Sequence, residues 1–295
     1  MKQSILIIFL CLSLTAFATK RALLIGISDY PAVRHTGAGW AKIHGANDVN
    51  MLRLNLKKQG FKVTTLIDEK ATASRIRRAF EKIQIEAAPG DLIYIHFSCH
   101  GQPVEDYNGD EDDGWDEAII PYDACQIPVK GVYSGKNHII DDELNLWFSK
   151  LRKKIGSTGF LYVVVVVDAC HSGGIDRGEE YEEEEEVFVR GTKTGFSLSN
   201  KSYVPRLDTR ANIPIKSEKG MAETCMLEAC RAYQSNYEFK QNGTYYGPLS
   251  FYVNKVLMRH KLSSDDSWVK DVKKLMDNNP RLVRQNMVIQ TTKKK

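Results

Sequence analysis

The chain has 295 residues, of which 42% are hydrophobic and 26% are charged, and its formal net charge is +4. This composition can bury an ordinary core and excludes disorder of the whole chain, and the length lies at the upper limit for one domain. Because the charge is small and no basic stripe interleaved with aromatic residues occurs, nucleic acid is not an expected partner.

The first segment, residues 1–18, has the pattern of a secretory signal peptide. A lysine at position 2 precedes an apolar run, and Ala16-Phe17-Ala18 supplies the small residues of a cleavage site. The alternative is a retained membrane anchor, but the run is short for a bilayer span. We therefore expect a secreted or periplasmic protein with no stable membrane insertion once this segment is removed.

Apolar runs alternate with segments of helical periodicity along residues 19–295. We expect strands at residues 22–27, 62–67, 91–97, 160–167 and 224–229, and helices from residue 49 to Gly60, over 71–84 and over about 142–153. Near-continuous apolar strands separated by helices imply a mainly parallel sheet with helices on both faces. The predicted fold is a doubly wound α/β fold in a single domain.

Reactive side chains stand at two strand ends, in the sequences FSCHG (97–101) and DACHSGG (168–174). Ligands of open parallel sheets bind beyond the carboxyl ends of the strands, so these two segments are candidates for one site. Cys170 and His171 are adjacent and would point to opposite faces of an extended chain. A base for the Cys170 thiol is therefore expected from another strand end, and His100 has the right placement.

Glycines flank both candidate residues. Gly101, Gly173 and Gly174 would let the backbone approach a substrate and present N–H groups to a developing oxyanion. The alternative for each residue alone is structural: a buried small thiol for Cys170 and a satisfied polar side chain for His100. A zinc site or a thiol oxidoreductase is also conceivable, but the chain lacks the C-x-x-C spacing typical of both.

Cysteine usage agrees with a free thiol at Cys170. Removal of residues 1–18 leaves five cysteines, namely Cys99, Cys125, Cys170, Cys225 and Cys230. An odd number in an exported chain leaves at least one of them unpaired, unless it pairs with another chain.

Two aspartates are candidates for a pocket that binds a cation. Asp168 stands two residues before Cys170 and would oppose thiolate formation, so an acid at this position is better explained as the partner of an Arg or Lys side chain of a substrate. Asp48, beyond the first strand, would reach the same crevice. Capping of the helix that begins at Val49 is the equally weighted alternative for Asp48.

The motifs SCHG and DACHSG resemble the catalytic His and Cys motifs of metacaspases and related caspase-like cysteine peptidases. The resemblance extends from RALLIGI through GANDVNML to LEACRAYQSNYE and implies a caspase-like fold. It implies a catalytic dyad of His100 and Cys170, with Asp48 and Asp168 in the pocket for the residue before the scissile bond. The caspase signature Q-A-C-x-G is absent, and two acids favour Arg or Lys in that pocket over Asp.

The segment between the two motifs is rich in acids, at positions Asp106, Asp110, Glu111, Asp112, Asp113, Asp116 and Glu117. So many like charges repel unless they are solvated or bind a cation, and the register around Gly114 excludes an EF-hand. The resemblance implies a calcium site formed by Asp116, Asp141 and Asp142 with one further acid, for which Asp176 is nearest although Arg177 occupies the ungapped position. A solvated acidic loop is the alternative.

An acidic run at residues 179–186 leads into a segment rich in Arg, Lys and Ser, and we expect a flexible loop over about 177–215. Such a loop is where an Arg- or Lys-directed peptidase would cut itself, with candidate sites at Arg177, Arg190, Lys193, Lys201, Arg206 and Arg210. The sequence thus predicts a secreted, monomeric cysteine endopeptidase of polypeptides, activated by calcium and self-processing. The alternative is an inactive, calcium-binding interaction module with the same fold.

Overall fold

The structure is a computed structural model that describes residues 18–31, 39–157, 162–170, 186–263, 266–282 and 284–292. Several sequence predictions fall outside these ranges: the signal peptide except for its last residue, the possible calcium ligand Asp176, the oxyanion glycines Gly173 and Gly174, and the candidate cleavage site Arg177.

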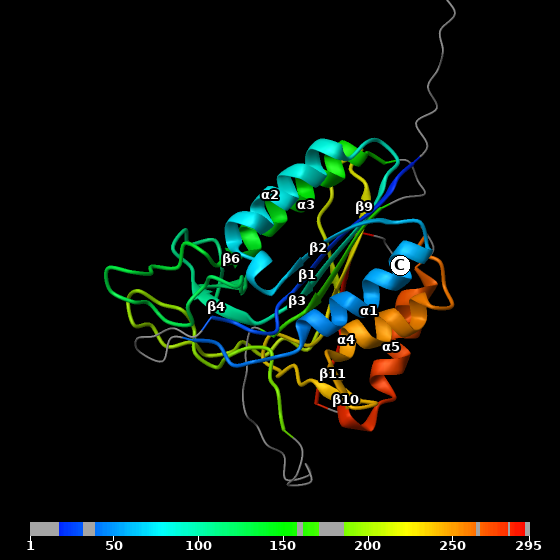
Figure 1. Cartoon of the computed structure of the whole chain (residues 1–295). Coiled ribbons are helices and arrows are strands. Elements are labelled where there is room, and N and C mark those ends of the chain that lie inside the picture. Colours follow the sequence, from blue (N-terminus) through cyan, green and yellow to red (C-terminus); the bar gives the residue numbers. More distant parts are fainter. Residues whose placement is uncertain are drawn as a thin grey trace, which may run out of the picture.

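A seven-stranded sheet forms the centre of the molecule (Figure 1). Its strands, in spatial order, are β2 (Lys62–Ile67), β1 (Lys20–Gly26), β3 (Leu92–Ser98), β7 (Tyr162–Asp168), β9 (Glu223–Glu228), β12 (Val288–Thr291) and β8 (Asn212–Pro214). The five strands from β2 to β9 are parallel, whereas β12 runs antiparallel to β9. The prediction of a mainly parallel sheet is confirmed.

Helices cover both faces of this sheet, also as predicted (Figure 1). One face carries α1 (Gly45–Lys58), α4 (Pro248–Leu257) and α5 (Ser267–Asp277), and the other carries α2 (Ala73–Glu86) and α3 (Asp141–Ile155). Short 3-10 helices occupy Asp68–Lys70 and Pro280–Leu282. None of the helices in the described ranges is both long enough and apolar enough to span a bilayer.

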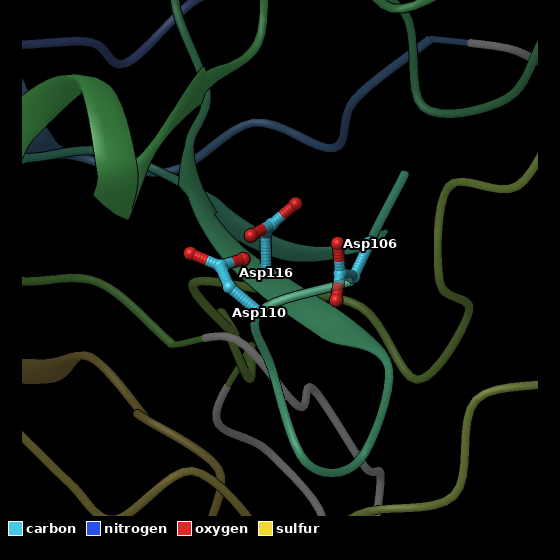
Figure 2. Close-up of side chains that lie close together, drawn as sticks. All are labelled: Asp106, Asp110 and Asp116. Atoms are coloured by element: carbon cyan, nitrogen blue, oxygen red, sulfur yellow. The ribbon is translucent and has the colours of Figure 1, made fainter. Parts of the chain in front are cut away.

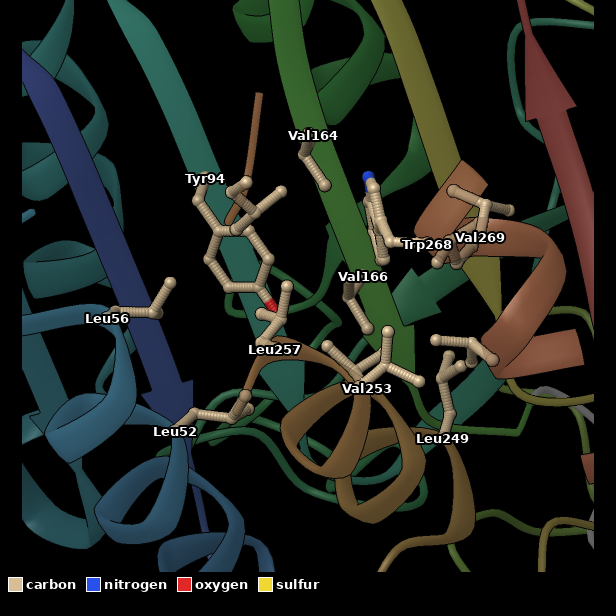
Figure 3. Close-up of a cluster of buried hydrophobic side chains, with 14 of the residues drawn as sticks. Leu52, Leu56, Tyr94, Val164, Val166, Leu249, Val253, Leu257, Trp268 and Val269 are labelled. Atoms are coloured by element: carbon tan, nitrogen blue, oxygen red, sulfur yellow. The ribbon is translucent and has the colours of Figure 1, made fainter. Parts of the chain in front are cut away.

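The valine run of β7 is buried on both faces of the sheet. Val164 and Val166 pack with α1, α4 and α5, and Figure 3 shows them among side chains of that layer such as Val253 and Trp268. Val163 and Val165 pack into the opposite layer. Successive side chains of a strand alternate between faces, and a sheet buried on both faces needs apolar residues at every position.

Two small β-elements were not predicted. A three-stranded antiparallel sheet contains β4 (Gly101–Glu105), β5 (Trp115–Ile119) and β6 (Ile139–Ile140), and a hairpin contains β10 (Phe239–Gln241) and β11 (Thr244–Tyr246). These strands have five residues or fewer, and β4, β5 and β10 mix apolar with polar or charged residues, so they lack the long apolar run that identified the central strands. β4 follows His100 directly and carries the chain away from the site.

Candidate active site

The two motifs meet at one edge of the sheet. β3 and β7 are parallel neighbours in which Ser98 pairs with Asp168, and His100 and Cys170 each follow two residues later. The carboxyl ends of parallel neighbours lie side by side, so the fold brings the two members of the candidate dyad together.

His100 is buried and held in one tautomer. Its Nε2 lies 2.9 Å from the carbonyl oxygen of Ala41, and a carbonyl can only accept, so Nε2 carries the proton. The ring stacks on Trp40 at a centroid distance of 4.8 Å. Burial lowers the pKa of His100 to about 4, although the bond to Ala41 opposes this. Within the described residues Nδ1 has no hydrogen-bond partner, so a neutral His100 presents a basic nitrogen.

Cys170 is fully buried beside a second thiol. Its Sγ donates to the carbonyl oxygen of Gln234 at 2.7 Å, and Sγ of Cys230 donates to the same oxygen at 3.5 Å. The hydrogen bond with Cys170, followed by burial, raises the pKa of Cys230 well above its ordinary value. All five cysteines of the described ranges are free of disulfides.

A third segment lies across both strand ends. The carbonyl oxygen of Arg190 accepts from the backbone N–H of Cys170 at 2.8 Å and from that of Gly101 at 3.3 Å. Gly101, the predicted oxyanion donor, thus shares this carbonyl oxygen with the N–H of Cys170. The next residue, Gly191, packs so closely on Cys170 that a Cβ there would collide with the Cys170 carbonyl oxygen.

The side chain of Arg190 enters a buried pocket lined by Asp48, Asp168 and Glu238, which we call the arginine pocket. Its Nη2 lies 2.7 Å from Asp48 Oδ2 and 2.8 Å from Glu238 Oε1, and its Nε donates to the same Glu238 oxygen at 3.0 Å. Asp168 Oδ1 is more distant, at 3.5 Å from Nη1. All four charged side chains are fully buried.

Neutral groups complete the arginine pocket. Ser98 Oγ accepts from Arg190 Nη1 at 2.7 Å and donates to Asp48, and the carboxylate of Asp168 accepts from Asn236 Nδ2 and Ser250 N, each at 2.7 Å. Gly247 donates its N–H to Asp48, and a Cβ at this position would collide with both Asp168 and Arg190. A glycine is therefore required at position 247 for a guanidinium to fit.

Three carboxylates around one guanidinium leave an excess of negative charge. Burial raises the pKa of Asp48 to about 7, because the attraction of Arg190 only partly offsets it. Burial also opposes ionisation of Glu238, but Arg190 and His44 outweigh it and lower that pKa. Because the pKa of Asp48 is raised and that of Glu238 is lowered, Glu238 keeps its negative charge to lower pH than Asp48 does. Glu238 accepts two hydrogen bonds from Arg190 and two from His44.

The arginine pocket contains both acids that the sequence singled out, Asp48 and Asp168. Asp48 and Asp168 converge on a cation, here one supplied by the chain itself. The capping alternative for Asp48 is wrong, because α1 begins at Gly45 and Asp48 lies inside its first turn. Glu238 was missed: it follows a polar segment with no strand or helix signal, and only its place in LEACRAYQSNYE, the last stretch of the resemblance, pointed to that region.

A second group of acids comes from the acid-rich segment between the two motifs. Asp106, Asp110 and Asp116, which we call the acidic cluster, each place a carboxylate oxygen within 4.8 Å of the others (Figure 2). Burial raises the pKa of Asp116 to about 7, followed in effect by repulsion from Asp141 and other acids. Its Oδ1 is buried and has no hydrogen-bond partner among the described residues.

The predicted calcium ligands are only partly gathered. Asp116 stands in the acidic cluster, whereas Asp141 accepts from the N–H of Glu117 at 3.3 Å and Asp142 accepts from Asn108 at 2.7 Å. Asp141 and Asp142 nonetheless act electrostatically on Asp116. Asp106 and Asp110 were not predicted as ligands, although they lie in the acid-rich segment.

A Cys and a His at neighbouring strand ends of a parallel sheet, beside an acidic pocket, are features of caspase-like peptidases. A family model described as a caspase domain matches residues 19–294, and the chain therefore belongs to the caspase-domain family. A solved structure of a protein from Geobacter sulfurreducens shares the fold, with a TM-score of 0.60 at 21% identity over 94% of each chain.

The named relatives are metacaspases. The chain is 33% identical to Metacaspase-1B of Aspergillus fumigatus over 52% of this chain and 35% of that protein, and 34% identical to Metacaspase-7 of Arabidopsis thaliana over 55% and 37%. It is 31% identical to Metacaspase-2 of Trypanosoma brucei brucei over 77% and 58%. The chain thus spans less than two thirds of the length of each of these relatives.

Proposed function

We propose that the chain is a cysteine endopeptidase that cleaves polypeptides after Arg or Lys, and that one of its substrates is its own Arg190–Gly191 bond. The observation that carries this proposal is the position of Arg190. Its guanidinium fills the arginine pocket while its carbonyl oxygen accepts from the N–H groups of Cys170 and Gly101. A substrate must present its reacting carbonyl in this way, next to the nucleophile and its oxyanion donors.

In the proposed reaction, Cys170 is the nucleophile and His100 is first its base and then the acid. The Cys170 thiol gives its proton to Nδ1 of His100, and the sulfur attacks the carbonyl carbon of Arg190. The Cys170 and Gly101 N–H groups hold the negative charge that forms on the carbonyl oxygen. His100 then protonates the nitrogen of Gly191 as the peptide bond breaks, and water hydrolyses the resulting thioester.

The described arrangement corresponds to a resting state. The Cys170 thiol donates to the carbonyl of Gln234, so it must rotate toward His100 before attack. The lowered pKa of His100, about 4, keeps the imidazole neutral but makes it a weak base in this arrangement. Transfer of the thiol proton therefore requires the imidazolium to be stabilised by the Cys170 thiolate beside it. Of the candidate self-cleavage sites in the described ranges, Lys201 and Arg210 lie elsewhere, bonded to Gly114 and Asp208.

The acidic cluster supports a second part of the proposal, activation by calcium. Hard carboxylate oxygens are the ligands that Ca²⁺ prefers, and the buried, unpartnered Oδ1 of Asp116 fits such a cation. Asp106, Asp110 and Asp116 would hold the ion, with Asp141 and Asp142 close enough to contribute negative charge. The proposal also retains export by the signal peptide, for which the pattern of residues 1–18 is the support.

The test uses the chain from residue 19 and its Cys170→Ala variant, each incubated with and without calcium. Mass spectrometry of the active chain should find a fragment that ends at Arg190, and peptides ending in Arg or Lys should be cleaved while those ending in Asp are not. The Cys170→Ala and His100→Ala variants should stay intact. Cleavage after Asp, or full turnover by either variant, contradicts the proposal, and a folded wild type without any activity favours the inactive interaction module.

A further inference from the structure

A cluster of aromatic side chains lies next to the arginine pocket. His44, just before α1, stacks on Tyr245 of β11 with ring centroids 5.0 Å apart and an interplanar angle of 21°. The ring of Phe188 stands edge-on against both, at 4.6 Å from His44 and 4.8 Å from Tyr245. Phe188 lies two residues before Arg190, on the segment that occupies the site.

The backbone explains why Phe188 reaches this cluster. The N–H of Arg190 donates to the carbonyl of Asn236 at 3.0 Å, and the N–H of Glu238 donates to the carbonyl of Phe188 at 2.9 Å. Val189 forms an antiparallel bridge with Tyr237. Alternate side chains of an extended segment point the same way, so Phe188 and Arg190 face the same side and Val189 faces the other.

The aromatic cluster is coupled to the arginine pocket through one carboxylate. Glu238 accepts from the backbone N–H of His44 at 2.7 Å and contacts His44 Nδ1 at 2.6 Å, while its other contacts go to Arg190. These two bonds fix the orientation of the imidazole on which Phe188 packs. His44, Tyr245 and Phe188 are each partly exposed, so a ring on a separate polypeptide has access to the same place.

We propose that His44 and Tyr245 form a subsite that selects an aromatic side chain two positions before the cleaved Arg. This inference rests on the proposed function and specifies its substrate class as polypeptides containing aromatic-X-Arg. The antiparallel pairing with Asn236–Glu238 supplies affinity that does not depend on sequence, and the side-chain pockets supply selectivity. Edge-to-face aromatic contacts stabilise a bound ring beyond its area burial alone.

The first experiment compares three acylated fluorogenic peptides, Phe-Val-Arg, Ala-Val-Arg and Ala-Phe-Arg, with the processed enzyme. We expect kcat/KM for Phe-Val-Arg to exceed that for Ala-Val-Arg by about tenfold, a factor within reach of two aromatic contacts. Ala-Phe-Arg should gain much less, because its ring faces the other side. A ratio near one for Phe-Val-Arg against Ala-Val-Arg overturns the subsite.

Two variants test which residues are responsible. Tyr245→Ala should reduce the ratio to near one, and Tyr245→Phe should preserve it because the ring is retained. Ile85→Ala, at an exposed position of α2 on the opposite face of the sheet, is the matched control and should change neither the ratio nor the rate. Since the ratio compares two peptides on one enzyme sample, it does not depend on how much of each variant is active. A ratio that survives in Tyr245→Ala contradicts the proposal.

A second measurement requires no catalysis and separates this inference from the proposed function. In the uncleaved Cys170→Ala chain, the amide hydrogen of Glu238 is bonded to the Phe188 carbonyl. Phe188→Ala in this background should accelerate hydrogen exchange at Glu238 by about tenfold, whereas Phe188→Tyr should not. If no peptide is cleaved but exchange responds in this way, the endopeptidase proposal fails and the aromatic subsite stands. Unchanged exchange in Phe188→Ala overturns the subsite.

Discussion

The arginine pocket and the acidic cluster each gather three carboxylates, but they balance that charge differently. In the pocket, Arg190 of the same chain contacts Asp48 and Glu238 directly. Among the described residues, no Lys or Arg forms an ion pair with any member of the acidic cluster, and the nearby Lys201 donates instead to the carbonyl of Gly114. The comparison teaches that similar carboxylate groups differ in what balances their charge: a planar guanidinium fills the arginine pocket, whereas the acidic cluster holds no Lys or Arg of the described residues and suits the calcium ion that we propose for it.

The largest expected effect comes from removing the internal cation of the arginine pocket. Arg190→Ala in the Cys170→Ala background should lower the free energy of unfolding by about 3–5 kcal/mol, because it leaves buried carboxylates unpaired. Urea unfolding measures this change. Arg152→Ala is the matched control: Arg152 is also buried, but its side-chain hydrogen bonds within the described ranges go to the neutral groups of Ala222 and Ser217 and it interacts with Glu218 only electrostatically, so about 1–2 kcal/mol is expected. Equal losses in both variants would mean that the pocket charges are not balanced by Arg190.

Removing one carboxylate at a time should rank the pocket acids. Glu238→Gln should reduce kcat/KM for a peptide ending in Arg by about a hundredfold, and Asp168→Asn by only about tenfold, because Asp168 lies 3.5 Å from the guanidinium and bonds mainly to neutral donors. Steady-state kinetics of processed enzyme gives these values. Asp91→Asn, a buried aspartate paired with Arg21 at the other end of β3, should retain the preference for Arg. A larger loss for Asp168→Asn than for Glu238→Gln reverses the ranking.

The smallest expected effect concerns the acidic cluster and pH. We expect calcium to bind with a Kd of roughly 10⁻⁴–10⁻³ M at pH 8, and more weakly by about tenfold at pH 6. The sign follows from Asp116, whose raised pKa of about 7 means that a proton must leave before the ion binds below that pH. The same shift makes the calcium-free protein lose stability as pH rises from about 4 through 7.

Calorimetry at the two pH values checks this prediction. Asp116→Asn should abolish the binding, while Asp208→Asn, at an acid that pairs with Arg210 outside the cluster, should leave it unchanged. Binding that is independent of pH, or binding that survives in Asp116→Asn, would assign the ion to other residues. Absence of binding at millimolar calcium would make the acidic cluster a solvated loop.

The sequence allowed prediction of the five parallel strands of the central sheet because these strands carry local signals, whereas the short edge strands β8 and β12 were not predicted. The valines of β7 and the apolar run of β3 are recognisable without any partner, and their order along the chain implied a parallel sheet. The motif residues at the ends of these strands then followed from topology. The small sheet β4-β5-β6 could not be predicted, because its strands have five residues or fewer, carry no long apolar run and are held by pairing with one another.

The sequence could not predict that Arg190 and Glu238 belong to the arginine pocket, for a different reason. Arg190 was one of six basic candidates in its loop, and nothing local distinguishes it from Lys193 or Arg206. Its selection depends on a contact with Asp48 that spans 142 positions of the chain. Glu238 is similar, since only the folded hairpin region places its carboxylate between Arg190 and His44.

The position of the Arg190 carbonyl has a kinetic consequence. The bond after Arg190 already lies beside Cys170, so under the proposed function its hydrolysis is a first-order reaction within one molecule. Its half-time does not depend on how many copies are present, whereas cleavage of a separate polypeptide does. A dilute sample would therefore cleave itself after Arg190 with the same rate constant as a concentrated one.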